Sequence, residues 1–240
     1  MWLALDTATD QVSVAVGRPG AASSALEENL AGARRHAGAL LPMVQTLLSR
    51  AGATLDDLEG IVLSDGPGSF TGLRVGASVA KALVHARRLP LWTAPSLLVR
   101  AAGFAGDGAL VLAVSNALRG ELYAAAYGFS SDEIRTELTP LVRRPEELAA
   151  GGLRPDVVVG EAPSEALAVL ERWIGWKVIG PPEGSPRAAR LLDLVRRRGG
   201  ARLVEVVRGW EPVYGRPAEA QARWESVHGR PLPDSVGSSS

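Results

Sequence analysis

The sequence predicts an α/β protein with two lobes, because strands and helices follow one another in a similar order in both halves of the chain. Each half opens with apolar strand segments and continues into helices whose apolar positions recur at helical spacing. The glycine-rich stretch 103–108 lies between the halves and is typical of a domain boundary. We therefore expect mixed sheets flanked by helices, with a first lobe at residues 1–103 and a second lobe at residues 104–208.

The first lobe shows three kinds of signal: short apolar runs for strands, helical periodicity, and a capping box at Thr54. Its predicted strands cover residues 2–5, 12–16, 25–30 and 61–63. Its predicted helices cover residues 33–51, 73–88 and 97–102. Pro42 lies inside the first of these helices and predicts a kink, since proline removes one backbone hydrogen bond.

The second lobe begins with a meander and then alternates strands with helices. Its predicted strands cover residues 110–114, 121–127, 137–142, 157–159, 177–179 and 204–207. Its predicted helices open at Pro145 and cover residues 163–173 and 186–198, and a last helix is expected at 217–226. The tail 228–240 is rich in Pro, Gly and Ser, which predicts disorder.

A glycine turn joins the strand at 61–63 to the helix at 73–88. Glycine permits positive φ in the turn, and a hydroxyl side chain can cap the helix that follows. Backbone N–H groups at a helix start suit an anion, for which the candidate residues are Gly66, Gly68, Ser69 and Thr71. The Walker lysine is missing, because Leu73 and Arg74 follow the last glycine. The alternative is a sharp corner without a ligand, and both interpretations stay open.

The stretch Gly66-Pro-Gly-Ser-Phe-Thr-Gly-Leu-Arg74 closely resembles the signature of the TsaB (YeaZ) family, part of the bacterial machinery that makes threonylcarbamoyladenosine in tRNA beside the anticodon. Leu5-Asp-Thr-Ala8, Leu40-Leu-Pro42 and Pro212-Val-Tyr214 match in the same order. The resemblance spans residues 1 to about 225. It implies an actin-like, ribonuclease-H-like (ASKHA) fold duplicated in two lobes.

Two further expectations come from this resemblance. The segment at about 209–227 should pack back on the first lobe. The turn Asn116-Ala117-Leu118 departs from the Asp-Ala-Arg of most relatives, which argues against a catalytic or phosphate-binding role there.

Asp6 and Thr7 follow the first strand and resemble the phosphate-binding hairpin of actin-like and sugar-kinase ATPases. The alternative, which we favour, is an ordinary turn in which Asp6 accepts hydrogen bonds from the turn's own N–H groups. Asp65 ends another strand of the same lobe and could face Asp6, but no partner carboxylate clearly completes a magnesium site. Single His36, with Leu40 four residues later, is not a metal pattern.

The resemblance implies a non-catalytic subunit that binds and activates the catalytic protein TsaD together with the ATPase TsaE, contacts tRNA only through the complex, and forms a homodimer when alone. We expect no metal or cofactor of its own, with ATP or ADP left open at the partner interface. The alternative is an ATP-binding actin-like or kinase-like enzyme that uses Asp6, Thr7 and the Gly66–Gly72 turn.

Small residues along the helix at 73–88, and leucines over a broad arc of the helix at 33–51, leave more apolar surface than one sheet covers. In the family these two helices meet the equivalent helices of TsaD, or of a second copy, as a bundle. The expected interface residues are Leu40, Leu41, Val44, Leu73, Gly76, Ala77 and Ala80.

Composition excludes several classes of protein. The formal net charge is zero, so no global field attracts nucleic acid. The absence of cysteine excludes disulfides and thiolate metal sites. Neither a signal peptide nor a membrane-spanning run is predicted, and we expect a cytoplasmic protein.

Overall fold

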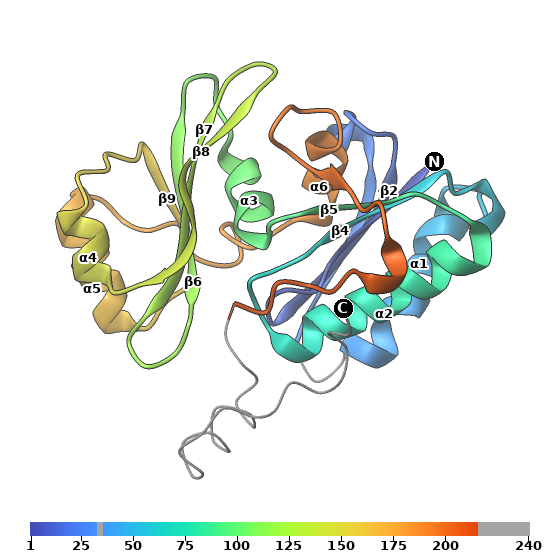
Figure 1. Cartoon of the computed structure of the whole chain (residues 1–240), viewed down its shortest axis with the longest axis horizontal. Coiled ribbons are helices and arrows are strands. Elements are labelled where there is room, and N and C mark those ends of the chain that lie inside the picture. Colours follow the sequence, from blue (N-terminus) through green and yellow to red (C-terminus); the bar gives the residue numbers. More distant parts are fainter. Residues whose placement is uncertain (33–35, 216–240) are drawn as a thin grey trace, which may run out of the picture.

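The computed structural model describes residues 1–32 and 36–215, and Figure 1 shows two β-sheets with helices between and outside them. Sheet A has six strands in the order β10-β5-β4-β1-β2-β3, and sheet B has four in the order β8-β7-β6-β9. The strands of sheet A are β1 (Trp2–Asp6), β2 (Gln11–Gly17), β3 (Leu26–Ala31), β4 (Gly60–Ser64), β5 (Leu91–Ala94) and β10 (Arg202–Leu203). The strands of sheet B are β6 (Leu110–Asn116), β7 (Leu122–Phe129), β8 (Ile134–Arg143) and β9 (Val157–Gly160).

The two sheets share one topology. In sheet A, β2 runs antiparallel to both β1 and β3, whereas β4 runs parallel to β1. In sheet B, β7 runs antiparallel to both β6 and β8, whereas β9 runs parallel to β6. The repeated order and strand directions confirm the duplicated ribonuclease-H-like, actin-like fold that the sequence predicted.

Helices form layers on both sides of each sheet (Figure 1). Their bounds are α1 (His36–Arg50), α2 (Phe70–Arg87), α3 (Ser96–Ala101), α4 (Pro145–Ala150), α5 (Ser164–Ile174) and α6 (Ala188–Leu194). Helices α1 and α2 cover one face of sheet A, α3 and α6 lie between the sheets, and α4 and α5 cover the far face of sheet B. The central core thus belongs to both lobes, because residues of both sheets and of both intervening helices share it.

The lobes exchange helices at this central core. Helix α3 precedes the expected boundary at residue 103, yet it contacts strands β6, β7 and β9 of sheet B. Helix α6 comes from the second half of the chain, yet it packs on β1, β2 and β4 of sheet A. Strand β10 also lies in sheet A, paired with β5, so its placement in a lobe at 104–208 was wrong.

Most predicted elements are present, but strand β5 in the first half was not predicted, and the other departures lie in the second half. A strand at 204–207 was wrong: the strand is β10, and a 3-10 turn covers Val207–Gly209. The strand at 177–179 is reduced to a single bridge between Val159 and Ile179. The helix at 217–226 and the tail at 228–240 lie outside the described residues. None of the helices within the described ranges is long and apolar enough to cross a membrane.

Gly76 marks the closest approach of α2 to sheet A. A Cβ added there would lie 2.4 Å from Thr7 Oγ1 and 3.2 Å from a methyl group of Leu63. Both neighbours are buried in the core, so they have little room to move. The glycine therefore lets the helix lie directly on the end of β1, and this explains why a residue with poor helix propensity stands in a helix interior.

We expect Gly76→Ala to lower the free energy of unfolding by about 2 kcal/mol, since a methyl group must be forced into a filled space. Gly38→Ala on α1 is the matched control, because no atom lies within 4 Å of its added Cβ. The control should be neutral or slightly stabilising. Urea unfolding of both variants measures the difference, and equal stabilities would contradict the close packing.

Candidate functional site

The glycine turn uses its polar groups within the protein. Ser69 caps α2, its hydroxyl accepting a hydrogen bond from Gly72 N at 3.2 Å, as the sequence predicted. Gly66 N donates to Ser96 Oγ at 2.9 Å, and Ser69 N donates to the carbonyl of Ala8 at 2.7 Å. The amides of Gly66, Ser69 and Gly72 therefore already have partners within the protein. Thr71 lies on the exposed side of α2 and turns away from this corner.

The turn after β1 packs directly against the glycine turn. A Cβ on Gly68 would lie 2.2 Å from the carbonyl oxygen of Ala8, so only glycine fits there. Asp6 and Thr7 are fully buried beside this contact. Asp6 Oδ1 accepts a hydrogen bond from Ala8 N at 3.1 Å, which is the ordinary turn interaction that we favoured for this residue.

Asp6 and Asp65 have different electrostatic surroundings. Burial raises the pKa of Asp65, and Arg202, which donates a hydrogen bond to Asp65 Oδ2 at 2.8 Å, offsets only part of this rise. Asp6 has no ion pair at comparable distance within the described residues. Burial raises its pKa from 3.8 to about 6, although the Ala8 amide, the Ser64 hydroxyl and Arg100 lower it. These carboxylates therefore do not act as a matched pair.

A layer of buried polar atoms surrounds Asp6 where the strands of sheet A meet the second lobe. Arg100 on α3 pairs with Glu161 at 3.1 Å, while its other terminal nitrogen has no hydrogen-bond partner. Several more buried atoms in the described part of the chain lack partners of regular geometry: Asp6 Oδ2, Thr7 Oγ1, Ser64 Oγ, Thr93 Oγ1 and Tyr127 Oη. Buried polar groups of this kind usually bind water or a ligand. Within residues 1–32 and 36–215, no three His, Asp or Glu side chains gather as metal ligands.

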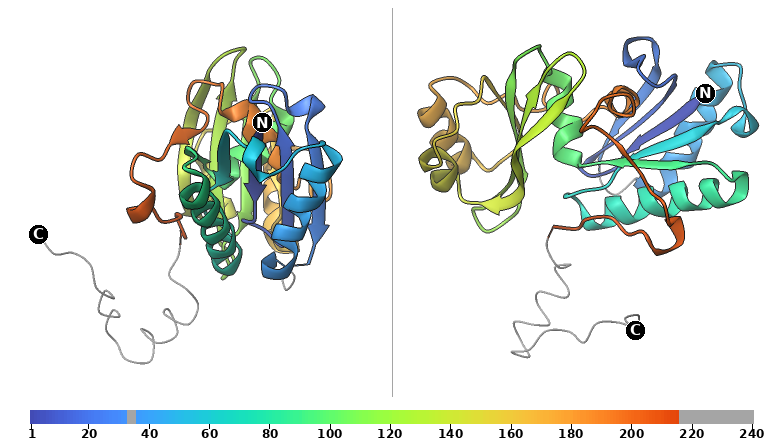
Figure 2. Two further views of the ribbon diagram at one scale, coloured as in Figure 1. Left: turned by 90° about the vertical axis from the view of Figure 1, so that its right-hand side faces the viewer. Right: turned by 45° about the horizontal axis from the view of Figure 1, so that its top comes forward.

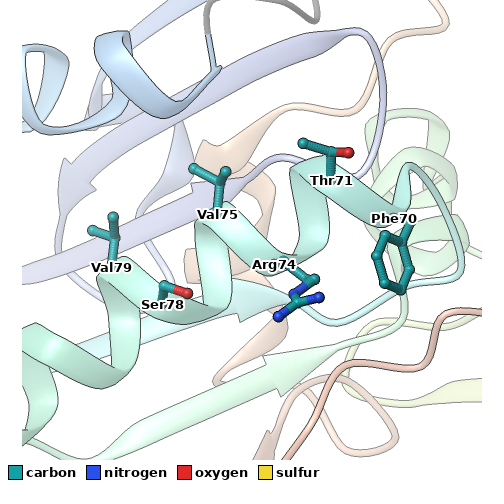
Figure 3. Close-up of a pocket in the computed structure, with 6 residues that line it drawn as sticks. All are labelled: Phe70, Thr71, Arg74, Val75, Ser78 and Val79. Atoms are coloured by element: carbon teal, nitrogen blue, oxygen red, sulfur yellow. The ribbon is translucent and has the colours of Figure 1, made fainter. Parts of the chain in front are cut away.

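The outer face of α2 carries a hollow with a volume of about 470 Å³. Figure 3 shows its lining on one side of the helix: Phe70, Thr71, Arg74, Val75, Ser78 and Val79. These positions recur at i, i+3 and i+4, which places them on one stripe. The stripe mixes valine side chains with one cation, Arg74, which lies 5.5 Å from the centre of the Phe70 ring. It is therefore amphipathic and open to the outside.

The segment at 207–215 runs along α2 and borders this stripe, as Figures 1 and 2 show. Lys81 Nζ lies 2.7 Å from Glu211 Oε1, and the Tyr214 ring lies 4.7 Å from that of Phe70. Val213 N donates to the carbonyl of Asp65 at 2.7 Å. Residues 209–215 thus contact the first lobe, and the remainder of the expected segment 209–227 lies outside the described residues.

The structure corrects the interface residues that the sequence suggested. All except Leu41 are buried inside the chain itself: Leu40, Val44, Leu73, Gly76, Ala77 and Ala80. Small residues on α2 let the helix approach its own sheet, as Gly76 does against Thr7, rather than another molecule. Leu41 on α1 is 47% exposed and remains available to a partner.

Sequence reasoning did not place Val75 and Val79 on the outward stripe, and it grouped Ser78, which does lie there, with the buried small residues. The signal was present, because these three positions lie on the opposite side of the helix from Gly76, Ala77 and Ala80. The sequence prediction assigned the small side chains of α2 to a partner interface. In the structure they face the chain's own sheet, and the opposite side of the helix faces outward. The stripe that faces outward is the one with mixed polar and β-branched residues.

Asp6→Asn should stabilise the protein above pH 6 by about 3 kcal/mol, with almost no effect near pH 4. The folded state raises the pKa of Asp6 to about 6, so it binds the proton more tightly than the unfolded chain does. The parent therefore loses stability as the pH rises from about 4 to about 6, whereas the substituted asparagine carries no charge to bury. Asp57→Asn is the control, because the Thr54 amide and hydroxyl lower the pKa of this exposed carboxyl. Urea unfolding across this pH range measures the free energy of unfolding of the parent and both variants. The same pH dependence in Asp6→Asn as in the parent would contradict the prediction.

Comparison with known proteins identifies the family. The family model for TsaD, described as tRNA N6-adenosine threonylcarbamoyltransferase, matches residues 30–175. The tRNA threonylcarbamoyladenosine biosynthesis protein TsaB of Escherichia coli (strain K12) is 33% identical over 188 residues, which is 76% of each chain. The protein of the same name from Bacillus subtilis (strain 168) is 28% identical and covers 79% of this chain and 83% of its own.

Solved structures agree with these relatives. An uncharacterized protein with similarity to peptidase YEAZ from Pseudomonas aeruginosa has a TM-score of 0.72 at 31% identity, covering 90% of this chain and 99% of its own. YeaZ from Pseudomonas aeruginosa has a TM-score of 0.65 at 30% identity, covering 80% of this chain and 88% of its own. The relatives in sequence, the similar structures and the glycine turn all indicate one family: the chain belongs to the TsaB (YeaZ) family.

Proposed function

We propose that this chain is a non-catalytic subunit in the biosynthesis of threonylcarbamoyladenosine in tRNA, which binds and activates TsaD together with TsaE. The observation that carries this proposal is the outward stripe of α2, an amphipathic hollow beside α1 that no part of the described chain fills. A mixed stripe along a helix, with the exposed Leu41 on neighbouring α1, suits a partner that offers helices of its own.

The hydrogen bonds of the glycine turn support a non-catalytic role. Gly66 N and Ser69 N already donate hydrogen bonds to Ser96 and Ala8, and Asp6 accepts one from the backbone. A nucleotide phosphate would have to displace these contacts before it could bind. The neutral charge balance likewise favours tRNA contact through the complex rather than by this chain alone.

A homodimer of the free chain would use the same stripe. An interface of standard size buries roughly 1,600 Å² in total, which the outer faces of two helices on each side can supply. The homodimer and the complex with TsaD would then exclude each other, since one surface serves both. ATP or ADP at the interface with TsaD fits this arrangement, because Arg74 lies on the stripe.

Ser78→Arg should abolish the association with TsaD and the self-association, while the fold stays intact. Ser78 is exposed, so the free chain tolerates the arginine, but a helix packed against it would have to bury an unpaired charge. Thr139→Arg, on the exposed side of β8, is the matched control. Light scattering with and without TsaD measures association, and circular dichroism checks folding. A folded Ser78→Arg variant that binds like the parent would exclude this stripe as the contact surface.

The second candidate function, an ATP-binding actin-like or kinase-like enzyme, has one observation in its favour. The unpartnered atoms Asp6 Oδ2 and Thr7 Oγ1 lie at the end of β1, where such enzymes hold phosphate. Both side chains are fully buried, however, and Gly68 lies directly against the next residue, Ala8. The site must open before it can take a nucleotide, which disfavours this function.

We therefore expect the isolated chain to bind ATP with magnesium weakly or not at all at the glycine turn. The reason is that Gly66 N and Ser69 N already donate hydrogen bonds within the protein and that the Walker lysine is missing. Titration calorimetry measures the affinity, with Asp6→Ala as the diagnostic variant. A micromolar site that disappears in Asp6→Ala would favour the enzyme over the non-catalytic subunit.

A further inference from the structure

A second hollow, with a volume of about 820 Å³, lies at the end of sheet A where β1 begins. This end is remote from the glycine turn. The lining of the hollow shares no residue with the stripe on α2. We propose that this hollow binds a nucleoside 5′-phosphate, either free or within a single strand of RNA. The proposal does not rest on the proposed function, because it concerns a different surface.

Two tryptophans form the aromatic part of the hollow. Trp2 on β1 and Trp92 on β5 meet edge to face, with ring centres 6.3 Å apart and planes at 63°. The Trp2 ring lies over Gly60, where an added Cβ would come within 2.7 Å of the ring atoms. One ring face thus rests on the backbone of β4. Both tryptophans remain partly exposed and line the hollow, so an aromatic base can stack on them.

Two arginines supply positive charge to the same hollow. Arg18 follows β2, and Arg196 follows α6. Their segments are joined by a hydrogen bond from Gly20 N to the carbonyl of Leu192 at 2.9 Å. The Arg196 stem also packs near Gly20, with its Cγ 3.3 Å from an added Cβ there. Both arginines are exposed.

The acidic groups nearby do not neutralise these arginines. Glu59 lines the hollow but pairs with the amino group of Met1 at 3.1 Å. Asp193 on α6 accepts a hydrogen bond from Ala22 N at 3.0 Å and lies 3.9 Å from Arg190. The hollow therefore keeps an excess of positive charge in a protein whose formal net charge is zero.

The chemistry of this lining selects an anion with an aromatic body. Arginine recognises phosphate well, because its planar guanidinium presents several donors at once. Tryptophan gives a large stacking surface to a base. The volume also falls in the range of about 300–1,000 Å³ typical of small-ligand sites. A nucleoside phosphate joins both features in one molecule, whereas an inorganic anion uses only the arginines.

Titration calorimetry of the full chain with adenosine 5′-monophosphate tests the proposal. We expect saturable binding that weakens roughly tenfold or more in Arg18→Glu and in Arg196→Glu, since each removes one charge-assisted contact. Arg172→Glu is the matched control on exposed α5 in the other lobe, and it should bind like the parent. Adenosine and ribose 5-phosphate, which carry only one of the two features, should each bind more weakly than the nucleotide.

Titration with a single strand of four adenylates distinguishes a free nucleotide from RNA as the ligand. Tighter binding of the strand than of the mononucleotide assigns the hollow to RNA, and equal or weaker binding assigns it to a free nucleotide. Three results would overturn the proposal: no heat with the nucleotide, equal binding of ribose 5-phosphate, or equal losses in Arg172→Glu and the two test variants. Because none of these variants touches α2 or Asp6, a failure here leaves the association with TsaD untouched.

Discussion

The contact between the turn after β1 and the glycine turn before α2 determines how the first lobe packs. Gly68 lies against the Ala8 carbonyl, and Ser69 N donates to the same oxygen, so the corner before α2 is tied to the turn after β1. Gly76, two turns along the helix, then lies directly on Thr7. This geometry decides which stripe of α2 is buried. Asp6, in the turn tied down by this contact, is fully buried, and burial raises its pKa.

Packing between the two sheets links the lobes. Helices α3 and α6 lie between the sheets, and each packs on the sheet formed by the other half of the chain. Two ion pairs accompany this exchange: Arg100 with Glu161 and Asp65 with Arg202. A nearly buried guanidinium such as that of Arg100 is costly to desolvate, so pairing it specifies an arrangement more than it adds stability. The shared core and the crossing helices thus join the two lobes in one packed unit.

Local patterns predicted the fold well. Apolar runs indicated every strand of sheet B and all those of sheet A except β5 and β10. Ser69 and Thr54 marked helix starts, since capping depends on neighbours in sequence. Patterns could not show which sheet a helix covers: α3 and α6 cross between lobes because of tertiary packing. Nor could they tell whether the small residues of α2 face a partner or the chain's own sheet. That depended on Gly76 meeting Thr7, a contact between residues far apart in sequence.

The actin-like fold of this chain places a glycine turn in front of a helix, at the corner before α2. Phosphate sites in such folds depend on backbone amides left free at a glycine turn. Here Gly66 N donates to Ser96 and Ser69 N donates to Ala8, and these hydrogen bonds hold the corner in place. Fixing that corner fixes the axis of α2, and hence the outward stripe from Thr71 to Val79. The turn that resembles a binding site thus acts mainly by orienting the helix that follows it.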